Sequence, residues 1–143
     1  TQIMRYKKKI SGPILDRIDM HVHVPAIQVD KLAESAADDV DNSETIRSRV
    51  QKARDRQIQR YKTIGITANA ELRNKEIKKF CTLSEECHTL LRLAVSKMNL
   101  SGRSYYRVIK MSRTIADLEG TEEIHKNHIA EALQYRPKQE NAI

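Results

Sequence analysis

The stretch Thr82–Leu100, TLSEECHTLLRLAVSKMNL, carries the clearest helical signal in the chain. Thr82 followed by Glu85 fits a capping box, in which the two side chains satisfy backbone N–H groups of the first helical turn. Beyond it, apolar side chains recur at the spacing of one helix face: Cys87, Leu90, Leu91, Ala94, Val95 and Met98. A single apolar face predicts a core helix that packs against other helices.

Helices are also predicted on both sides of this stretch. One begins after Asn42 or Ser43, runs to about Tyr61 and is expected to turn inward Ile46, Val50, Ala53 and Tyr61. A short helix covers about 73–80, after the break at Gly65. A longer helix begins at Ser101 and ends at Gly120. Its predicted inner face is made of Tyr105, Val108, Ile109, Ser112 and Ala116. A last helix ends before Pro137 with one inner face made of Ile129, Ala132 and Leu133. Residues 43–136 are therefore predicted to form a bundle of four or five helices.

The N-terminal part differs from this bundle. Residues 1–10 form a basic segment with Arg5, Lys7, Lys8 and Lys9, and a turn or helical stretch is expected around residues 11–16. Between Ile18 and Val24, apolar and polar residues alternate up to Pro25, which is the pattern of a strand with one buried face. A lone strand leaves its edges open, so we expect it to belong to a sheet outside this chain. Residues 26–42 are acidic and small and read as a linker, with a weak helical turn near 31–35.

Composition sets limits on the function. The 143 residues carry a formal charge of +7, which suits an anionic partner such as nucleic acid or nucleotide. Aromatic residues make up only 4%, so the core must be aliphatic and the chain mainly helical. Two cysteines are too few for a disulfide scaffold. With no membrane-spanning stretch and no leader, we expect a soluble, cytoplasmic protein.

The first predicted helix carries the densest positive cluster. Its cations are Arg47, Arg49, Lys52, Arg54, Arg56, Arg60 and Lys62. Such a surface suits contact with nucleic-acid phosphates, and Arg47, Arg49, Lys52, Arg56 and Arg60 are the candidate residues. The alternative is a solvated helix face with no ligand.

Other candidate sites are weak. His21 and His23 share one face of the predicted strand, but no carboxylate or cysteine accompanies them at ligand spacing, so we predict no metal. His125 stands where a helix begins and is expected to cap it, which leaves no reason to pair it with His128 as a ligand. Cys87 is expected in the core, and Cys81 has no partner that would make it a thiolate. The chain has no phosphate loop, so it is not expected to hydrolyse ATP on its own.

Separated blocks of the sequence, in the same order, closely resemble the C-terminal part of the magnesium-chelatase-like AAA+ ATPases of the ComM/YifB type. The blocks are SGPILDRIDMHVHVP (11–25), IRSRVQKARDRQIQRY (46–61), LSGRSYYRVIKMSRTIADLEG (100–120) and HIAEALQYR (128–136). The resemblance implies that 1–25 end an AAA+ core, 26–42 are a linker, 43–137 are the helical lid and 138–143 are a tail. The family's phosphate loop and magnesium-binding acids would lie upstream of Thr1, so ATP and Mg²⁺ would be bound mainly there.

The resemblance also implies roles for two arginines. Arg17, in the LDR block, resembles the arginine finger that reaches the ATP of a neighbouring subunit, where a planar guanidinium stabilises the charge of phosphoryl transfer. Arg103 resembles the sensor-2 arginine, which contacts nucleotide in its own subunit. A finger acting across subunits requires a ring, expected to be a hexamer, and the implied task is ATP-driven remodelling of DNA in recombination or competence.

Two alternatives stay open. The same arginine pair would serve the motor subunit of a magnesium chelatase, and the basic cluster would then face a protein partner. The chain could also be a non-enzymatic helical module that binds nucleic acid, with Arg17 and Arg103 structural.

Overall fold

A computed structural model of the chain describes residues 14, 17–26 and 42–136. Within them lie the helices α4 (Ser43–Tyr61), η1 (Asn69–Glu71, a 3-10 helix), α5 (Asn74–Phe80), α6 (Glu85–Met98), α7 (Gly102–Glu119) and α8 (Lys126–Gln134). The mainly helical class is confirmed, and five α-helices make up the bundle expected over 43–136. The basic segment 1–10, the stretch 11–13, the linker residues 27–41 and the tail 138–143 lie outside the described residues.

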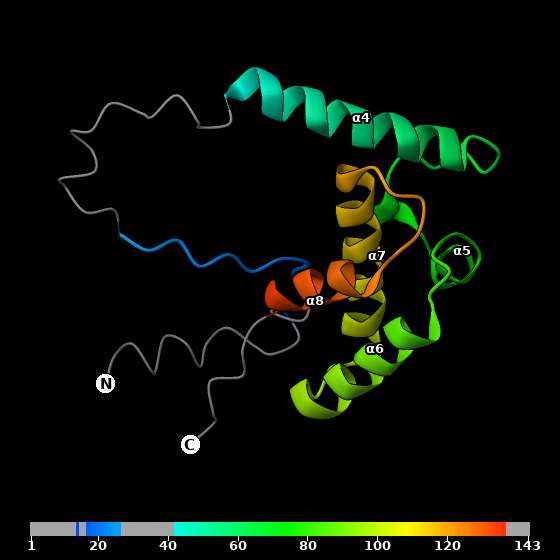
Figure 1. Ribbon diagram of the computed structural model, residues 1–143. Coiled ribbons are helices and arrows are strands. Elements are labelled where there is room, and N and C mark those ends of the chain that lie inside the picture. The colour runs from blue at the N-terminus through cyan, green and yellow to red at the C-terminus, as the bar shows by residue number, and fades with distance from the viewer. Residues whose placement is uncertain (1–13, 15–16, 27–41, 137–143) are drawn as a thin grey trace.

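Helix α7 stands at the centre of the bundle, with α4 crossing one end, α8 beside it and α6 toward the other end (Figure 1). α7 packs against α8, α4, η1 and α5, and α6 packs against α8. The largest fully buried side chains include Tyr61, Leu91, Val108 and Ile129, one from each of four helices. Because these side chains come from the predicted inner faces, hydrophobic burial is what assembles the helices.

Helices α4, α6 and α7 each begin at a short polar side chain that caps the first turn. The Asn42 side chain accepts a hydrogen bond from the Thr45 N–H (2.8 Å), and the Ser101 side chain accepts one from the Ser104 N–H (3.1 Å). Both caps were predicted. The cap of α6 was predicted wrongly, because Ser84 and not Thr82 accepts from the Cys87 N–H (3.4 Å). Ser84 stands three residues before that N–H, which is the separation an N-cap needs.

Gly120 ends α7 as predicted, with φ of 92°, a left-handed conformation that glycine adopts without a steric penalty. The inner face predicted for α4 is only half correct. Ala53 and Tyr61 are buried, but Ile46 and Val50 are 41% and 45% exposed. The reason is that the first half of α4 extends beyond α7 and has no helix beneath it (Figure 1).

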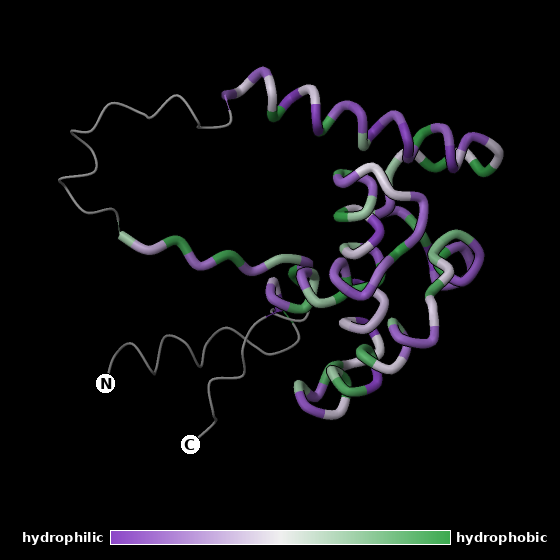
Figure 2. The backbone as a smooth tube through the Cα atoms, in the orientation of Figure 1, coloured by the Kyte–Doolittle hydropathy of each residue, from purple (hydrophilic) through white to green (hydrophobic). Residues whose placement is uncertain are grey.

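No β-strand forms among the described residues, so the strand predicted over 18–24 is not observed here. The segment is extended, and apolar and polar residues alternate along it (Figure 2), but it has no neighbouring strand in the described chain to pair with. Without a covering sheet its apolar side chains stay open to solvent, with Val22 and Val24 63% and 80% exposed. Residues 18–21 contact the bundle through hydrogen bonds, at α7 and just after α8.

Candidate anion-binding site

Helix α7 presents three cations near its N-terminus. Arg103 lies in the first turn, Arg107 follows four residues later and Lys110 three residues after that, so all three share one helix face. The first turn also carries backbone N–H groups without intrahelical partners, and the helix dipole places partial positive charge there. This end of α7 is therefore electrostatically suited to an anion.

The three cations line one cleft of about 660 Å³. Its other walls come from residues 18–26, η1, α5 and α7 itself: Asp19, Ala70, Asn74, Gly102, Tyr106, Met111 and Thr114. A cleft of this size suits a small organic ligand, and the convergent cations would fix the orientation of phosphate groups in it. Apart from Asp19, none of the lining residues is acidic.

The cations differ in how they are held. Arg107 forms an ion pair with Asp19, and the Lys110 ammonium donates to the carbonyl oxygen of Ala70 (2.8 Å). Burial lowers the pKa of Lys110, and the nearby Arg107 charge lowers it further. The negative charge of an anion in the cleft would oppose this lowering of the Lys110 pKa. Arg103 is exposed at the rim, as expected for a residue that must reach a ligand.

Arg17 does not line this cleft, although Asp19, two residues later, does. The side chain of Arg17 is exposed, and the backbone N–H of Arg17 donates to the carbonyl oxygen of Ile14 (3.0 Å). Arg17 and Arg103 therefore do not meet in one cleft of this chain.

The basic residues of α4 fall into two groups. Arg47, Arg49 and Lys52 are exposed on the first half of the helix, and Arg49, Lys52 and Arg56 line a second cleft of about 630 Å³ beside Leu118 and Glu119. Arg56 also donates to the backbone carbonyl of Asp117 (2.8 Å). Arg60 donates to both carboxylate oxygens of Asp117 (2.5 and 3.0 Å). Arg56 and Arg60 thus hold α4 onto α7, a structural role that the sequence analysis did not anticipate.

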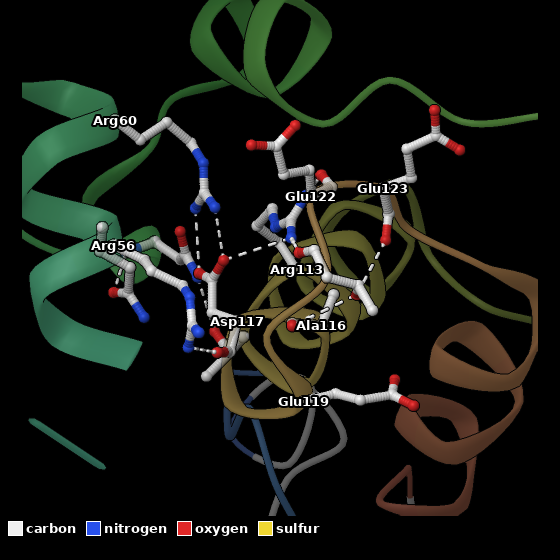
Figure 3. A network of polar contacts seen from close by, with 12 residues as sticks. Arg56, Arg60, Arg113, Ala116, Asp117, Glu119, Glu122 and Glu123 are labelled. Carbon is white, nitrogen blue, oxygen red and sulfur yellow. Dashed lines mark hydrogen bonds and ion pairs between the residues drawn. The ribbon is translucent and has the colours of Figure 1, made fainter. Parts of the chain in front are cut away.

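Asp117 is the centre of a buried polar network (Figure 3). Its side chain is fully buried and accepts hydrogen bonds from Arg60 and from the Asn69 amide (2.8 Å), while Arg113 lies 3.2 Å away. The Arg113 guanidinium also donates to the carbonyl oxygens of Thr121 and Glu122 (2.7 and 2.5 Å). These contacts join α4, η1, α7 and the turn after α7.

Burial acts on the charges of this network. Burial disfavours the charged form of Arg60, but the hydrogen bond and charge of Asp117 outweigh it and raise the pKa of Arg60. The pKa of Arg113 is lowered by burial, and the attraction of Asp117 offsets only part of this. Neither shift brings an arginine near neutrality at physiological pH, so Asp117 balances two permanent charges.

The histidines and cysteines have structural positions. His125 caps α8 as predicted, and its N–H donates to Nδ1 of the fully buried His128 (3.0 Å), whose Nε2 contacts Glu119. Cys87 is buried in the core as predicted. Cys81 is buried too, and burial raises the pKa of its thiol to about 11. Within residues 14, 17–26 and 42–136, no group of three or more potential ligands stands ready for a metal ion.

The sequence analysis missed Arg107, Lys110 and Asp117. Arg107 and Lys110 could have been found, because they stand four and seven residues after Arg103 and so share its helix face. Asp117 and Arg60 are 57 residues apart in the sequence, and no local pattern predicts that they pair.

Comparison with known proteins gives the class. The family model described as magnesium chelatase, subunit ChlI C-terminal, matches residues 40–136, and the model described as magnesium chelatase, subunit ChlI, matches residues 1–32. The chain therefore belongs to the magnesium chelatase subunit ChlI family, in its C-terminal region.

Within that family the chain is similar to proteins of the ComM/YifB type. It is 42% identical over 135 residues to "Competence protein ComM" of Haemophilus influenzae, a match covering 94% of this chain and 26% of that protein. It is 36% and 35% identical, with the same coverage, to proteins named YifB from Salmonella typhimurium and Escherichia coli. The chain thus spans about a quarter of the length of these relatives. None of its described helices combines the length and apolar character that crossing a bilayer demands.

Proposed function

We propose that this chain is the helical lid and coupling region of an AAA+ ATPase, with Arg103 as the cis sensor-2 arginine. The observation that carries the proposal is the cleft at the N-terminus of α7, where Arg103, Arg107 and Lys110 converge. Their charges, with the helix dipole, suit the phosphates of a nucleotide. ATP and Mg²⁺ would be held mainly by an ATP-binding core. The lid would contact the phosphates through Arg103.

In the same proposal, Arg17 is the trans arginine finger. Its exposure, and the fact that it does not line the Arg103 cleft, suit a residue that serves a neighbouring subunit. A guanidinium keeps its charge at any physiological pH and offers planar donors to phosphate oxygens. The site would then be complete only in a ring, which we take to be a hexamer.

The cleft is tested with inorganic tripolyphosphate and ATP as probes, titrated into the chain by calorimetry. Arg103→Gln should weaken binding of both at least about tenfold, the size expected for one charge-assisted contact. Arg92→Gln, on the surface of α6 and paired with Glu85, is the matched control and should change nothing. Equal affinities for wild type and Arg103→Gln would remove the sensor role.

The finger is tested in an assembled full-length protein that carries the ATP-binding core. Arg17→Ala should lower ATP turnover by about a thousandfold, the lower range for arginine fingers, with ring assembly intact by light scattering. Arg17→Lys should recover little, because an ammonium lacks the planar fork. Turnover at the parental rate in Arg17→Ala would end the finger assignment.

We further propose that the partner of the motor is DNA, engaged by Arg47, Arg49 and Lys52 on α4. These cations are exposed, whereas Arg56 and Arg60 bind Asp117 and hold the fold. The Haemophilus relative is named a competence protein, which agrees with the task in recombination or competence that the sequence resemblance implies. Fluorescence anisotropy with a labelled duplex tests this, and affinity that is insensitive to salt would contradict a phosphate contact.

The family description supports a second candidate, the motor subunit of a magnesium chelatase. The same cleft and finger would serve it, and the exposed cations of α4 would meet an acidic protein. DNA binding that is lost on neutralising α4 favours the DNA motor, and its absence favours the chelatase.

A further inference from the structure

Residues 18–21 are fastened to the bundle beside the candidate anion cleft. The buried Arg136, just after α8, donates from one guanidinium nitrogen to the carbonyl oxygen of Ile18 (2.9 Å) and from the other to Oγ of Ser104 (2.5 Å). The N–H of His21 donates to the carbonyl oxygen of Tyr135 (2.8 Å). These contacts hold the segment through its backbone groups.

The position of Ser104 shows what these contacts connect. Ser104 follows Arg103 in the first turn of α7, and its N–H bonds the Ser101 cap. At the other end of the bridge, Ile18 follows Arg17. Arg136 thus connects the turn that carries the proposed sensor to the residue next to the proposed finger, through one rigid and buried guanidinium.

A second connection runs through the cleft itself. Asp19 pairs with Arg107, and both line the cleft with Arg103. The Asp19 side chain is 59% exposed, so this carboxylate is open to displacement by a solute. A phosphate group would compete with it, because both are anions that seek the same guanidinium.

We propose that Arg136 and Asp19 are positioning residues that couple an anion in the α7 cleft to the placement of Arg17. This rests on the proposed function. With the cleft empty, Asp19 holds Arg107 and the segment is docked. When a polyphosphate binds Arg107, the Asp19 contact is lost. The hydrogen bonds of Arg136 remain, so that a movement of the helical turn at Ser104 would also move Ile18. Nucleotide bound in one subunit would thereby adjust the finger offered to the next.

The first test measures competition, with inorganic tripolyphosphate as the probe and the 143-residue chain as the protein. Asp19→Asn should bind tripolyphosphate about three- to fivefold more tightly, the range that loss of an exposed ion pair allows. Glu85→Gln is the matched control, since it also removes an exposed carboxylate paired with an arginine, on α6. If both variants bind tripolyphosphate more tightly by the same factor, the effect comes from net charge alone. The proposed competition between Asp19 and the ligand is then wrong.

The second test measures coupling by amide hydrogen exchange of His21, whose N–H reports docking of the segment. Tripolyphosphate should speed His21 exchange in the wild type by at least about threefold, and should leave Gly120, whose N–H bonds Ala116, unchanged as the control for folding. In Asp19→Asn, His21 should exchange faster before any ligand is added and respond little to it.

Arg136→Met should likewise speed His21 exchange without ligand, and protection at Gly120 shows whether the variant is folded. Should it not fold, Asp19→Asn carries the test alone. Tripolyphosphate that binds in an Arg103-dependent way while His21 exchange stays constant overturns the coupling and leaves the proposed function standing. Absence of any binding to the wild type overturns the anion site and the coupling with it.

Discussion

Two arginine–aspartate pairs tie α7 to other parts of the molecule, and they differ in burial. Asp117 is fully buried and meets Arg60, Arg113 and the Asn69 amide, whereas Asp19 is more than half exposed and pairs with Arg107. A buried carboxylate with several donors cannot lose one partner cheaply, because the charges left behind have no water to solvate them. An exposed pair exchanges its partners readily. The first pair maintains the fold, and the second can respond to a ligand.

The comparison is tested most severely at Asp117. Asp117→Asn keeps the shape of the side chain but removes the charge that balances Arg60 and Arg113, so it should lower the free energy of unfolding by about 3–5 kcal/mol. Urea unfolding followed by circular dichroism measures this. A variant too unstable to fold would be the extreme of the same result, and a loss below about 1 kcal/mol would show that the network is not what holds α4.

A smaller loss is expected at Arg60. Arg60→Lys keeps the charge but cannot donate to both Asp117 oxygens, so we expect a loss of about 2 kcal/mol in the same urea experiment. Arg54→Lys, at an exposed position of the same helix, is the control and should lie within about 0.5 kcal/mol of the wild type. If the two variants lose equally, the geometry of the Arg60 fork contributes nothing.

The bundle itself was predictable because its signals are local. The apolar spacing of α6 and α7, the caps Asn42 and Ser101 and the stop at Gly120 all lie within a few residues of the feature they specify. Apart from the cap of α6, where Ser84 takes the place predicted for Thr82, the errors occurred where a distant partner decides the outcome. Ile46 and Val50 have the right spacing for burial but no helix opposite them, and residues 18–24 have a strand pattern but no neighbouring strand in the described chain.

The candidate site was predictable in part. Arg103 was named from a family resemblance, and its position at a helix N-terminus supported it from the residues alone. Arg107 and Lys110 needed only the helical spacing. Asp19 and Arg136 could not be placed at the cleft from sequence, because a contact between residues 18 and 136 depends on how the chain folds back on itself. Arginines on one helix likewise look equivalent in sequence, although Arg60 is committed to Asp117 and Arg47 is exposed.

Asp19 is expected to matter much less for stability than Asp117. Asp19→Asn should lower the free energy of unfolding by less than about 1 kcal/mol, and the loss should vanish near 1 M salt, where charges are screened within about 3 Å. Urea unfolding at low and high salt measures both. A loss above about 2 kcal/mol would show that Asp19, like Asp117, maintains the fold. It would then not be a residue that a ligand displaces.

The smallest effect on stability is expected at the exposed cations of α4. The double variant Arg47→Gln, Lys52→Gln changes no residue of the Asp117 network, so its free energy of unfolding should stay within about 0.5 kcal/mol of the wild type.

The DNA binding of this double variant should still change. If both cations contact phosphates, the slope of log affinity against log salt should fall in magnitude by about 2, since each neutralised phosphate contributes about 0.9. Anisotropy titrations between 50 and 200 mM salt measure the slope. An unchanged slope in this stable variant would remove α4 from the DNA interface, and the exposed cations would then be a solvated face that keeps the chain in solution.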